Sequence, residues 1–349
     1  MRISLEETAL VDHPFVQRLR NIFSTGFSYL PFPGATHSRY AHSLGVMHLS
    51  GRAFDSAFEG WEFSNSDTRA SFRSVVRLAA LCHDLGHSPF SHCTEFAMPR
   101  LSELNLQWLE TPDENRIATH EDYTVGILQH ASVAEVIGKN FGFSARHVAA
   151  LICPEICVED DFFMDGGLDF REVLSQIISS ELDVDRMDYL VRDSYYSGAR
   201  YGQIDVSWLV SNLEVFPHDG KVSLALDSKA IYAFDDFMIA RHHMFLMVYF
   251  HHKSVVYEEL LKRWVKSPDC KWTLPANMDE YLFWDDSSLQ VHLRKSTSVW
   301  ARRVVEMRPY RRILEVHGTP DEVDLSKEMN MLENKGIDYI AAGSTGKLS

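Results

Sequence analysis

The stretch CHDLGHSPFSH, Cys82–His92, decides how this sequence is interpreted. It continues the apolar block VVRLAALC, Val75–Cys82, whose alanine and leucine content favours a helix. A glycine and a proline inside the stretch end that helix. His83 and Asp84 therefore stand at a helix end, and His87, four residues after His83, can share a face of the last turn.

Imidazoles and a carboxylate together form a good ligand set for a first-row divalent metal ion. A lone histidine is more often part of a satisfied hydrogen-bond network in a protein core. Here His83 and Asp84 are adjacent, and His87 and His92 follow a helix-breaking glycine. This density favours a metal site over the structural alternative.

Two flanking stretches offer further ligands. Upstream, HSRYAHSLGVMHL (37–49) places His42 at the start of an amphipathic helix. Downstream, SSELDVDRMDYLVRDSYYSG (179–198) carries Asp185 and Asp188, which are three residues apart and can share a helix face. An acidic helix is more often a solvated face, so these carboxylates become ligands only if the fold returns them to His83.

The pair His120 and Glu121 precedes an apolar helix pattern and allows two interpretations. Adjacent imidazole and carboxylate groups suit proton transfer. Alternatively, Thr119 and Asp122 form a variant of the capping box, and Glu121 simply favours a helix N-terminus. The spacing does not choose between them.

Composition limits the class of protein. The chain has 349 residues, 45% apolar and 24% charged, which predicts one large domain or two modest ones with a sizeable core. No apolar run approaches the roughly 20 residues of a membrane helix, and the start MRISLEETAL lacks the apolar segment of a secretory signal. Five scattered cysteines fit free thiols in a reducing compartment, so we expect a cytoplasmic protein.

Charge and histidine content narrow the function. The chain carries 34 Lys+Arg against 49 Asp+Glu, a formal net charge of -15, which disfavours an extended nucleic-acid interface. A polyanionic substrate would need positive charge concentrated in one pocket. Histidine is unusually frequent, at 17 residues.

Most of the chain has a helical pattern. Arg241–Lys266, rich in Met, Phe, Tyr and Val, predicts one long helix. Leu213–Leu226 reads LEVF, PHDG and KVSLAL, which predicts a β-hairpin. Gly60–Thr68 and Asp160–Asp169 are predicted loops, and the final residues AAGSTGKLS are a predicted mobile tail or the trimmed end of a longer chain.

These motifs resemble the HD-domain phosphohydrolases, in particular their deoxynucleoside triphosphate triphosphohydrolase (dNTPase) branch. The resemblance runs from about Phe15 to about Glu315. The matching motifs occur in order as FVQRLRNI (15–22), FPGATHSRYAHSLGV (32–46), CHDLGHSPFSH (82–92), His120-Glu121, LDVDRMDYLVRDSYYSG (182–198) and RHHMFLMVYFHHK (241–253).

The resemblance implies a mainly all-α HD-domain fold with a small β-hairpin near 213–226. Residues 1–205 would form the first part of the catalytic core. Residues 206–316 would continue the same domain with the hairpin and a pocket helix over 241–266, and 317–349 would be a C-terminal extension or mobile tail.

The resemblance also implies one divalent metal ion, held by His42, His83, Asp84 and Asp185. Two imidazoles and two carboxylates leave positions open for water and phosphate oxygens. Mn, Fe, Mg, Zn and Ni are not distinguished by the sequence.

Three histidines are implied to line the catalytic pocket: His87, His92 and His120, with Glu121 orienting one of them. We expect His92 to act at the α-phosphate and the other two to donate to phosphate oxygens. Imidazole suits this task because it exchanges protons near pH 7.

The implied substrate-binding residues are Arg39, Arg186, Tyr189, Asp193 and Tyr249. Arg39 would grip the α-phosphate, unless it is a surface residue in a loop. Arg186 stands where many relatives have a phosphate-binding lysine, and it offers a bidentate fork instead of a point charge. Tyr189 and Asp193 would contact the sugar, and Tyr249 would pack on the deoxyribose.

The sequence departs from the family pattern at three places. A one-residue shift would put Phe250 where Tyr249 is expected. Ser24-Thr25-Gly26 replaces a Gln-Leu-Gly element that contacts the sugar, and the Asp-Pro-(Val/Ile)-His-Gly element before FVQRLR is missing. The changes put sugar selectivity and nucleotide regulation in doubt.

The predicted function is metal-dependent hydrolysis of a dNTP to a deoxynucleoside and tripolyphosphate. The alternatives are an HD-type nucleotide phosphatase or phosphodiesterase, a non-catalytic nucleotide sensor, and a purely structural helical protein in which His42, His83 and Asp185 lie far apart. We expect a homo-oligomer, dimer or tetramer, with a dNTP or related nucleotide as substrate and a nucleotide effector left open. Neither a membrane nor nucleic acid is an expected partner.

Overall fold

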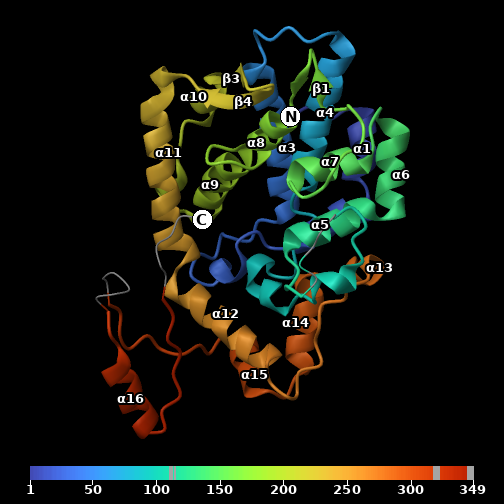
Figure 1. The fold of residues 1–349 in the computed structure, drawn as a ribbon. Helices are drawn as coiled ribbons and strands as arrows, with labels where there is room; N and C mark the ends of the chain where they lie inside the picture. The colour runs from blue at the N-terminus through green and yellow to red at the C-terminus, as the bar shows by residue number, and fades with distance from the viewer. Residues whose placement is uncertain (110–112, 114, 317–322, 344–349) are drawn as a thin grey trace.

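The computed structural model describes residues 1–109, 113, 115–316 and 323–343. Helices dominate, which confirms the predicted mainly α-helical fold (Figure 1). The α-helices of the first half are α1 (Leu5–Val11), α2 (Pro14–Arg18), α3 (Arg39–Ala57), α4 (Ser66–Cys82), α5 (His120–Gln129), α6 (Ala131–Asn140), α7 (Ala145–Ile152), α8 (Arg171–Ile178) and α9 (Val184–Ser197).

The second half continues in the same style. Its α-helices are α10 (Val206–Ser211), α11 (Ile231–Met244), α12 (His252–Val265), α13 (Met278–Tyr281), α14 (Asp286–Lys295), α15 (Val299–Val305) and α16 (Ser326–Asn334). The 3-10 helices are η1 (Leu19–Asn21), η2 (Gly26–Tyr29), η3 (Ser91–Ala97), η4 (Leu101–Leu104), η5 (Arg200–Gly202) and η6 (Ser228–Ala230). Within the described part of the chain, no helix combines the length and apolar character needed to cross a membrane.

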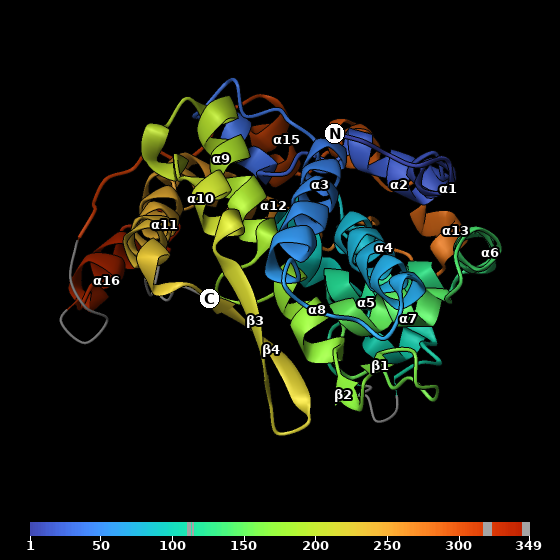
Figure 2. The same cartoon turned by 90° about the horizontal axis from the view of Figure 1, so that it is seen from above.

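The packing of α3, α4 and α9 builds the centre of the first half (Figure 2). Residues 75–82 of α4 are buried, as expected for a block that is apolar on almost every face. α3 approaches α9 closely at Gly45, where a Cβ atom would lie 1.9 Å from Oδ1 of Asp188. This packing brings the first turn of α3, the end of α4 and the first turn of α9 to one place.

The predicted hairpin is confirmed. β3 (Leu213–His218) pairs antiparallel with β4 (Lys221–Leu226) through a turn at Asp219 and Gly220, both at positive φ. Two short strands, β1 (Met164–Asp165) and β2 (Leu168–Asp169), complete a sheet of order β1-β2-β4-β3. The segment 160–169, predicted as a loop, therefore contains β1 and β2, and β2 pairs parallel with β4.

The predicted single helix over Arg241–Lys266 is wrong, because the segment is interrupted. α11 passes into a π-helix, η7 (Phe245–Tyr249), and α12 begins after His251, whose side chain accepts a hydrogen bond from the backbone of Lys253. A π turn contains one residue more than an α-helical turn, and the apolar composition of this segment does not indicate where such a turn occurs. Such turns occur often at functional sites, and this one carries Tyr249.

A continuous set of buried apolar residues extends from Leu10 in α1 to Ala301 in α15. It joins the segments 1–205 and 206–316, whose boundary stays a prediction. Of the predicted C-terminal extension, 317–349, the structure describes 323–343, which include α16. Residues 317–322 and most of the predicted tail, 344–349, lie outside the described residues.

Candidate active site and metal centre

Three helix ends carry the predicted metal ligands. His42 lies in the first turn of α3, His83 and Asp84 directly follow α4, and Asp185 lies in the first turn of α9. The start of α9 is fixed locally by Asp183, whose side chain accepts a hydrogen bond from the backbone of Arg186 and so caps the helix.

The fold brings all four predicted ligands together. Nε2 of His42 lies 2.9 Å from Oδ1 of Asp185 and 3.5 Å from Oδ2 of Asp84. Nε2 of His83 lies 3.3 Å from Oδ1 of Asp84 and 3.4 Å from Oδ1 of Asp185. The alternative of a purely structural protein, in which these residues lie far apart, is therefore wrong.

The other ring nitrogens show which protons the two histidines carry. Nδ1 of His42 lies 2.8 Å from Oδ2 of Asp188, and Nδ1 of His83 lies 2.8 Å from the carbonyl oxygen of Ala80. A carbonyl oxygen only accepts, so Nδ1 of His83 is the donor and its Nε2 is free to bind a cation. That Nε2 is buried and has no hydrogen-bond partner among the described residues.

Electrostatics at this cluster also fit a cation. Burial lowers the pKa of His42, but Asp185 and Asp188 outweigh it and raise the pKa to about 10. Burial would raise the pKa of Asp84, yet Arg39, His83 and His87 hold it well below its usual range. Ionised carboxylates thus surround both imidazoles, and a bound cation would replace the proton that His42 holds against Asp185. This His/Asp cluster is a candidate site for a divalent metal ion.

Asp188 was part of the acidic run in the sequence, but its contact with His42 could not be read from spacing. It orients the His42 ring while also pairing with Arg192, 2.7 Å from Nε. We expect Asp188→Asn to weaken metal binding by about 10- to 100-fold, because it removes the charge behind a ligand. Titration against a metal-chelating dye measures this, with Asp279→Asn, an exposed carboxylate paired with His130, as the control. Equal affinities in the two variants would contradict the role.

A second group lies beside the metal cluster and consists of His87, His92 and His120. The rings of His87 and His120 stack with centroids 4.0 Å apart, and the ring of His92 lies 4.7 Å from that of His87. Gly86 permits this approach, since a Cβ atom there would lie 1.9 Å from the carbonyl oxygen of His120. Nε2 of His87 lies 3.2 Å from Oδ1 of Asp84, which links the two groups.

The prediction that Glu121 orients one of these histidines is wrong. Glu121 is exposed at the start of α5, and the predicted capping box of Thr119 and Asp122 forms there instead. The orienting carboxylate is Glu95, with Oε1 2.6 Å from Nδ1 of His120 and Oε2 3.1 Å from Nδ1 of His92. Sequence reasoning missed Glu95, although it follows His92 by three residues.

The surroundings lower the pKa of two of these imidazoles, His87 and His92. Burial, together with Arg39 and His120, lowers the pKa of His87 well below its usual value. The ring of His92 is open to solvent on one side, but the protein around it and the charge of Arg39 lower its pKa. Burial would raise the pKa of Glu95, but hydrogen bonds from His120 and His92 hold it low. The ionised Glu95 therefore accepts hydrogen bonds from the Nδ1–H groups of His92 and His120. The Nε2 atoms of these two rings are left for a ligand.

Arg39 is buried at the start of α3, so the alternative of a surface arginine in a loop is wrong. Its Nη1 lies 2.5 Å from Oδ2 of Asp84, and its Nε donates to Oγ of Ser91 at 2.7 Å. Arg39 thus brings a fixed positive charge between the metal cluster and the loop that carries His92.

The remaining predicted residues lie along α9 and η7. Arg186 pairs with Asp183, and the rings of Tyr189 and Tyr249 meet edge to face with centroids 6.1 Å apart. The hydroxyl of Tyr249 donates to Oδ2 of Asp193 at 2.7 Å, and Nε2 of His37 lies 2.7 Å from the other oxygen. Phe250 instead stacks on Phe245, so the structure favours Tyr249 for this position over the one-residue shift.

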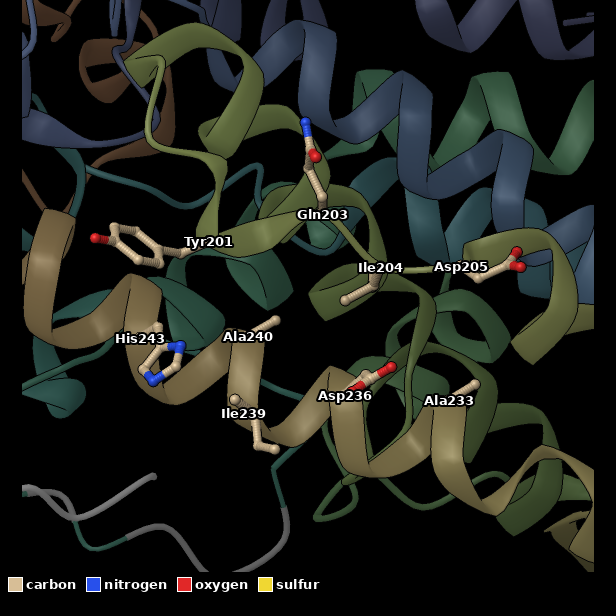
Figure 3. Close-up of a pocket in the computed structure, with 9 residues that line it drawn as sticks. All are labelled: Tyr201, Gln203, Ile204, Asp205, Ala233, Asp236, Ile239, Ala240 and His243. Carbon is tan, nitrogen blue, oxygen red and sulfur yellow. The ribbon is translucent and has the colours of Figure 1, made fainter.

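A separate hollow of about 310 Å³ lies between the chain after α9 and α11 (Figure 3). Its lining contains none of the predicted site residues and consists of Tyr201, Gln203, Ile204, Asp205, Ala233, Asp236, Ile239, Ala240 and His243. The site geometry described above therefore does not depend on it.

Comparison with known proteins agrees with this geometry. The HD domain family matches residues 39–193, and the HD associated region matches residues 204–341. The uncharacterized protein MJ1154 of Methanocaldococcus jannaschii is 29% identical over 311 residues, which is 88% of this chain and 56% of that protein. Human deoxynucleoside triphosphate triphosphohydrolase SAMHD1 is 28% identical over 257 residues, which is 69% of this chain and 39% of that protein.

A solved structure is also similar. The crystal structure of a hypothetical protein from Aquifex aeolicus superposes with a TM-score of 0.67 at 28% identity, covering 88% of this chain and 73% of that one. The chain spans about half the length of the curated relatives it matches, or less.

Proposed function

The chain is an HD-domain protein with an HD-associated region, and from this premise we propose that it is a metal-dependent dNTP triphosphohydrolase. The reaction would release the deoxynucleoside and tripolyphosphate. One observation carries the proposal: two histidine Nε2 atoms and two carboxylates converge beside a second group of histidines that Glu95 orients. The name of the similar human protein agrees with this reaction.

One divalent ion would be held by His42, His83, Asp84 and Asp185, and its identity among Mn, Fe, Mg, Zn and Ni is open. When bound, such an ion polarises a phosphoryl oxygen and lowers the pKa of a bound water. The role of the protein is to present the two imidazole Nε2 atoms and the ionised carboxylates in a fixed arrangement.

The histidine group would then handle the substrate. Glu95 accepts hydrogen bonds from the Nδ1–H groups of His92 and His120, so Nε2 is the atom of each ring that faces a ligand. We assign His92 to the α-phosphate, where its Nε2, after taking up a proton from solvent, would give that proton to the leaving 5′ oxygen and return to the neutral form. His87 and His120, once protonated at Nε2, would donate hydrogen bonds to phosphate oxygens, where they offset negative charge that builds in the transition state.

Arg39 would hold the α-phosphate while keeping Asp84 in place. We expect Arg39→Lys to lower kcat/KM by about 10- to 100-fold, because a lysine ammonium cannot replace the planar guanidinium, which bonds to Asp84 and to Ser91 at the same time. Steady-state kinetics with metal-saturated protein measures the change. Arg52→Lys on the outer side of α3, which contacts only Ser207 among its printed partners, is the matched control. Equal kcat/KM in both variants would exclude the role.

The sugar would lie near α9 and η7. Tyr249 and Asp193 are joined by a hydrogen bond and form one rigid wall with Tyr189, which suits packing against a deoxyribose. Arg186 lies one helical position after the ligand Asp185, in reach of the phosphates. A nucleotide effector and a homo-oligomer remain predictions about partners.

The experiment that tests the proposal is a panel of the four dNTPs and four NTPs with purified protein and Mn²⁺. Each nucleotide is supplied alone and in mixtures, and nucleoside release is followed by chromatography. We expect deoxynucleoside from at least one dNTP, and an effector would show as turnover only in mixtures. Binding without turnover of any nucleotide would favour a sensor and contradict the proposal.

A further inference from the structure

Asp286, the first residue of α14, reaches from the HD-associated region into the loop of the histidine group. Its side chain is buried, and only 4% of the residue is exposed. Oδ1 accepts the backbone N–H of Phe90 at 2.6 Å, and Oδ2 accepts the backbone N–H of Phe23 at 2.8 Å. One carboxylate thus joins two loops that are far from it in the sequence.

The loop held in this way has an unusual backbone. Phe90 and Ser91 have φ values of 57° and 58°, so two successive residues other than glycine adopt the left-handed conformation. This conformation is unfavourable for L-residues and persists only where surrounding contacts hold it. The pair lies directly before His92 and turns the chain so that this ring faces His87 and His120.

The same turn also places Arg39. Oγ of Ser91 donates to the carbonyl oxygen of Phe23 at 2.6 Å and accepts from Nε of Arg39 at 2.7 Å. Asp286 holds the N–H of Phe23 and the N–H of Phe90, so it closes a ring of contacts around Ser91. A shift of this turn would move both Arg39 and His92.

A second contact from the same segment holds the other end of the loop. The hydroxyl of Tyr281 donates to the carbonyl oxygen of Gly86 at 2.8 Å. Nη2 of Arg18 bridges the carbonyl oxygens of His87, at 2.9 Å, and Trp284, at 2.6 Å. The segment from Tyr281 to Asp286 therefore contacts the loop at both ends.

Helix stability alone does not explain the buried carboxyl group. α14 already has a complete capping box formed by Asp285 and Ser288. Burial raises the pKa of Asp286 to about 7, which means that the fold holds its charged form at a cost. A buried carboxylate that destabilises the fold and is not needed to cap its helix is typical of a functional constraint.

We propose that Asp286 is a positioning residue for the reaction, with Tyr281 as its second support. It acts through the Phe90–Ser91 turn, which sets the places of His92 and Arg39. This inference rests on the proposed function, and it assigns the HD-associated region a part in the active site.

Asp286→Asn is the variant that tests this role. Asparagine keeps the shape but turns an N–H toward one of the two backbone donors, so one of the two loops is released. We expect kcat to fall by about 10- to 100-fold, as for a small misplacement of catalytic groups, with KM and metal content nearly unchanged. Hydrogen exchange of the peptides that cover residues 86–93, followed by mass spectrometry, should become faster.

Asp285→Asn is the matched control, because asparagine is an equally good helix cap and the hydrogen bonds of Asp285 go to Ser288 within α14. It should resemble the unaltered protein in kcat and exchange. If Asp286→Asn does not fold, Tyr281→Phe, which removes only the hydroxyl bonded to Gly86, is judged by the same measurements. Equal kcat and equal exchange in the test and control variants would overturn the inference.

The two proposals can fail separately. If the unaltered protein hydrolyses no nucleotide, the proposed function fails. The exchange comparison between Asp286→Asn and Asp285→Asn then decides the positioning role, because it does not require activity.

Discussion

The His83→Ala variant is expected to lose its bound metal ion and to hydrolyse nucleotide at least about 1,000-fold more slowly than the unaltered protein. The reason is geometric. Nε2 of His83 is buried without a hydrogen-bond partner among the described residues and faces Asp84 and Asp185 at 3.3 and 3.4 Å. Without the imidazole of His83, Asp84 and Asp185 repel each other, and the remaining ligands cannot surround a metal ion closely. Elemental analysis of the purified protein, together with nucleoside release, measures both effects.

The control for this variant is His48→Ala. His48 also lies on α3 but takes no part in either histidine group. It should keep its metal and its rate. Circular dichroism shows whether His83→Ala keeps the helical fold. A folded His83→Ala protein with full metal content would contradict the assigned site.

The second large effect is expected for His92→Ala, which should keep its metal ion and lose about 100- to 10,000-fold in kcat. His92 does not contact the four ligands directly, and its Nδ1 is held by Glu95 at 3.1 Å. The variant therefore removes a proton-transfer group and leaves the cluster of His42, His83 and Asp84 in place. Single-turnover kinetics under saturating metal separates this loss from a change in substrate binding.

His218→Ala, in the exposed hairpin, is the control for His92→Ala. Elemental analysis adds a sharper outcome, because the histidine group also has the donor spacing of a metal site. If the unaltered protein holds two ions and His92→Ala holds one, the assignment of a single ion is wrong. An unchanged rate in His92→Ala would remove this residue from the reaction.

Much of the fold and part of the metal cluster can be predicted from the sequence. The apolar block before His83 predicts a buried helix that ends at the ligands, and α4 ends at Cys82. The stretch itself predicts His83 and Asp84 as ligands, whereas His42 and Asp185 are implied only by the resemblance, since spacing alone could not show that α3 and α9 return to α4. The absence of a side chain at Gly45 lets α3 and α9 approach closely enough to bring their ligands together.

Other parts of the site could not be predicted, because they depend on tertiary contacts. On local grounds Glu121, next to His120, fits a proton-transfer pair and a helix N-terminus equally well, and only the resemblance implies an orienting role. The left-handed turn at Phe90 and Ser91 brings Glu95 to His120 instead. Asp286 is 196 residues from the amide it binds at Phe90, a separation that no local pattern encodes.

The most direct test of the proposed reaction is the phosphorus product of dNTP hydrolysis, identified by ³¹P nuclear magnetic resonance. Cleavage at the bond between the α-phosphorus and the 5′ oxygen predicts tripolyphosphate and free deoxynucleoside in equal amounts. His83→Ala should form neither product. Orthophosphate or pyrophosphate as the first product, with a deoxynucleotide left behind, would contradict triphosphohydrolase chemistry and favour an HD-type phosphatase or phosphodiesterase.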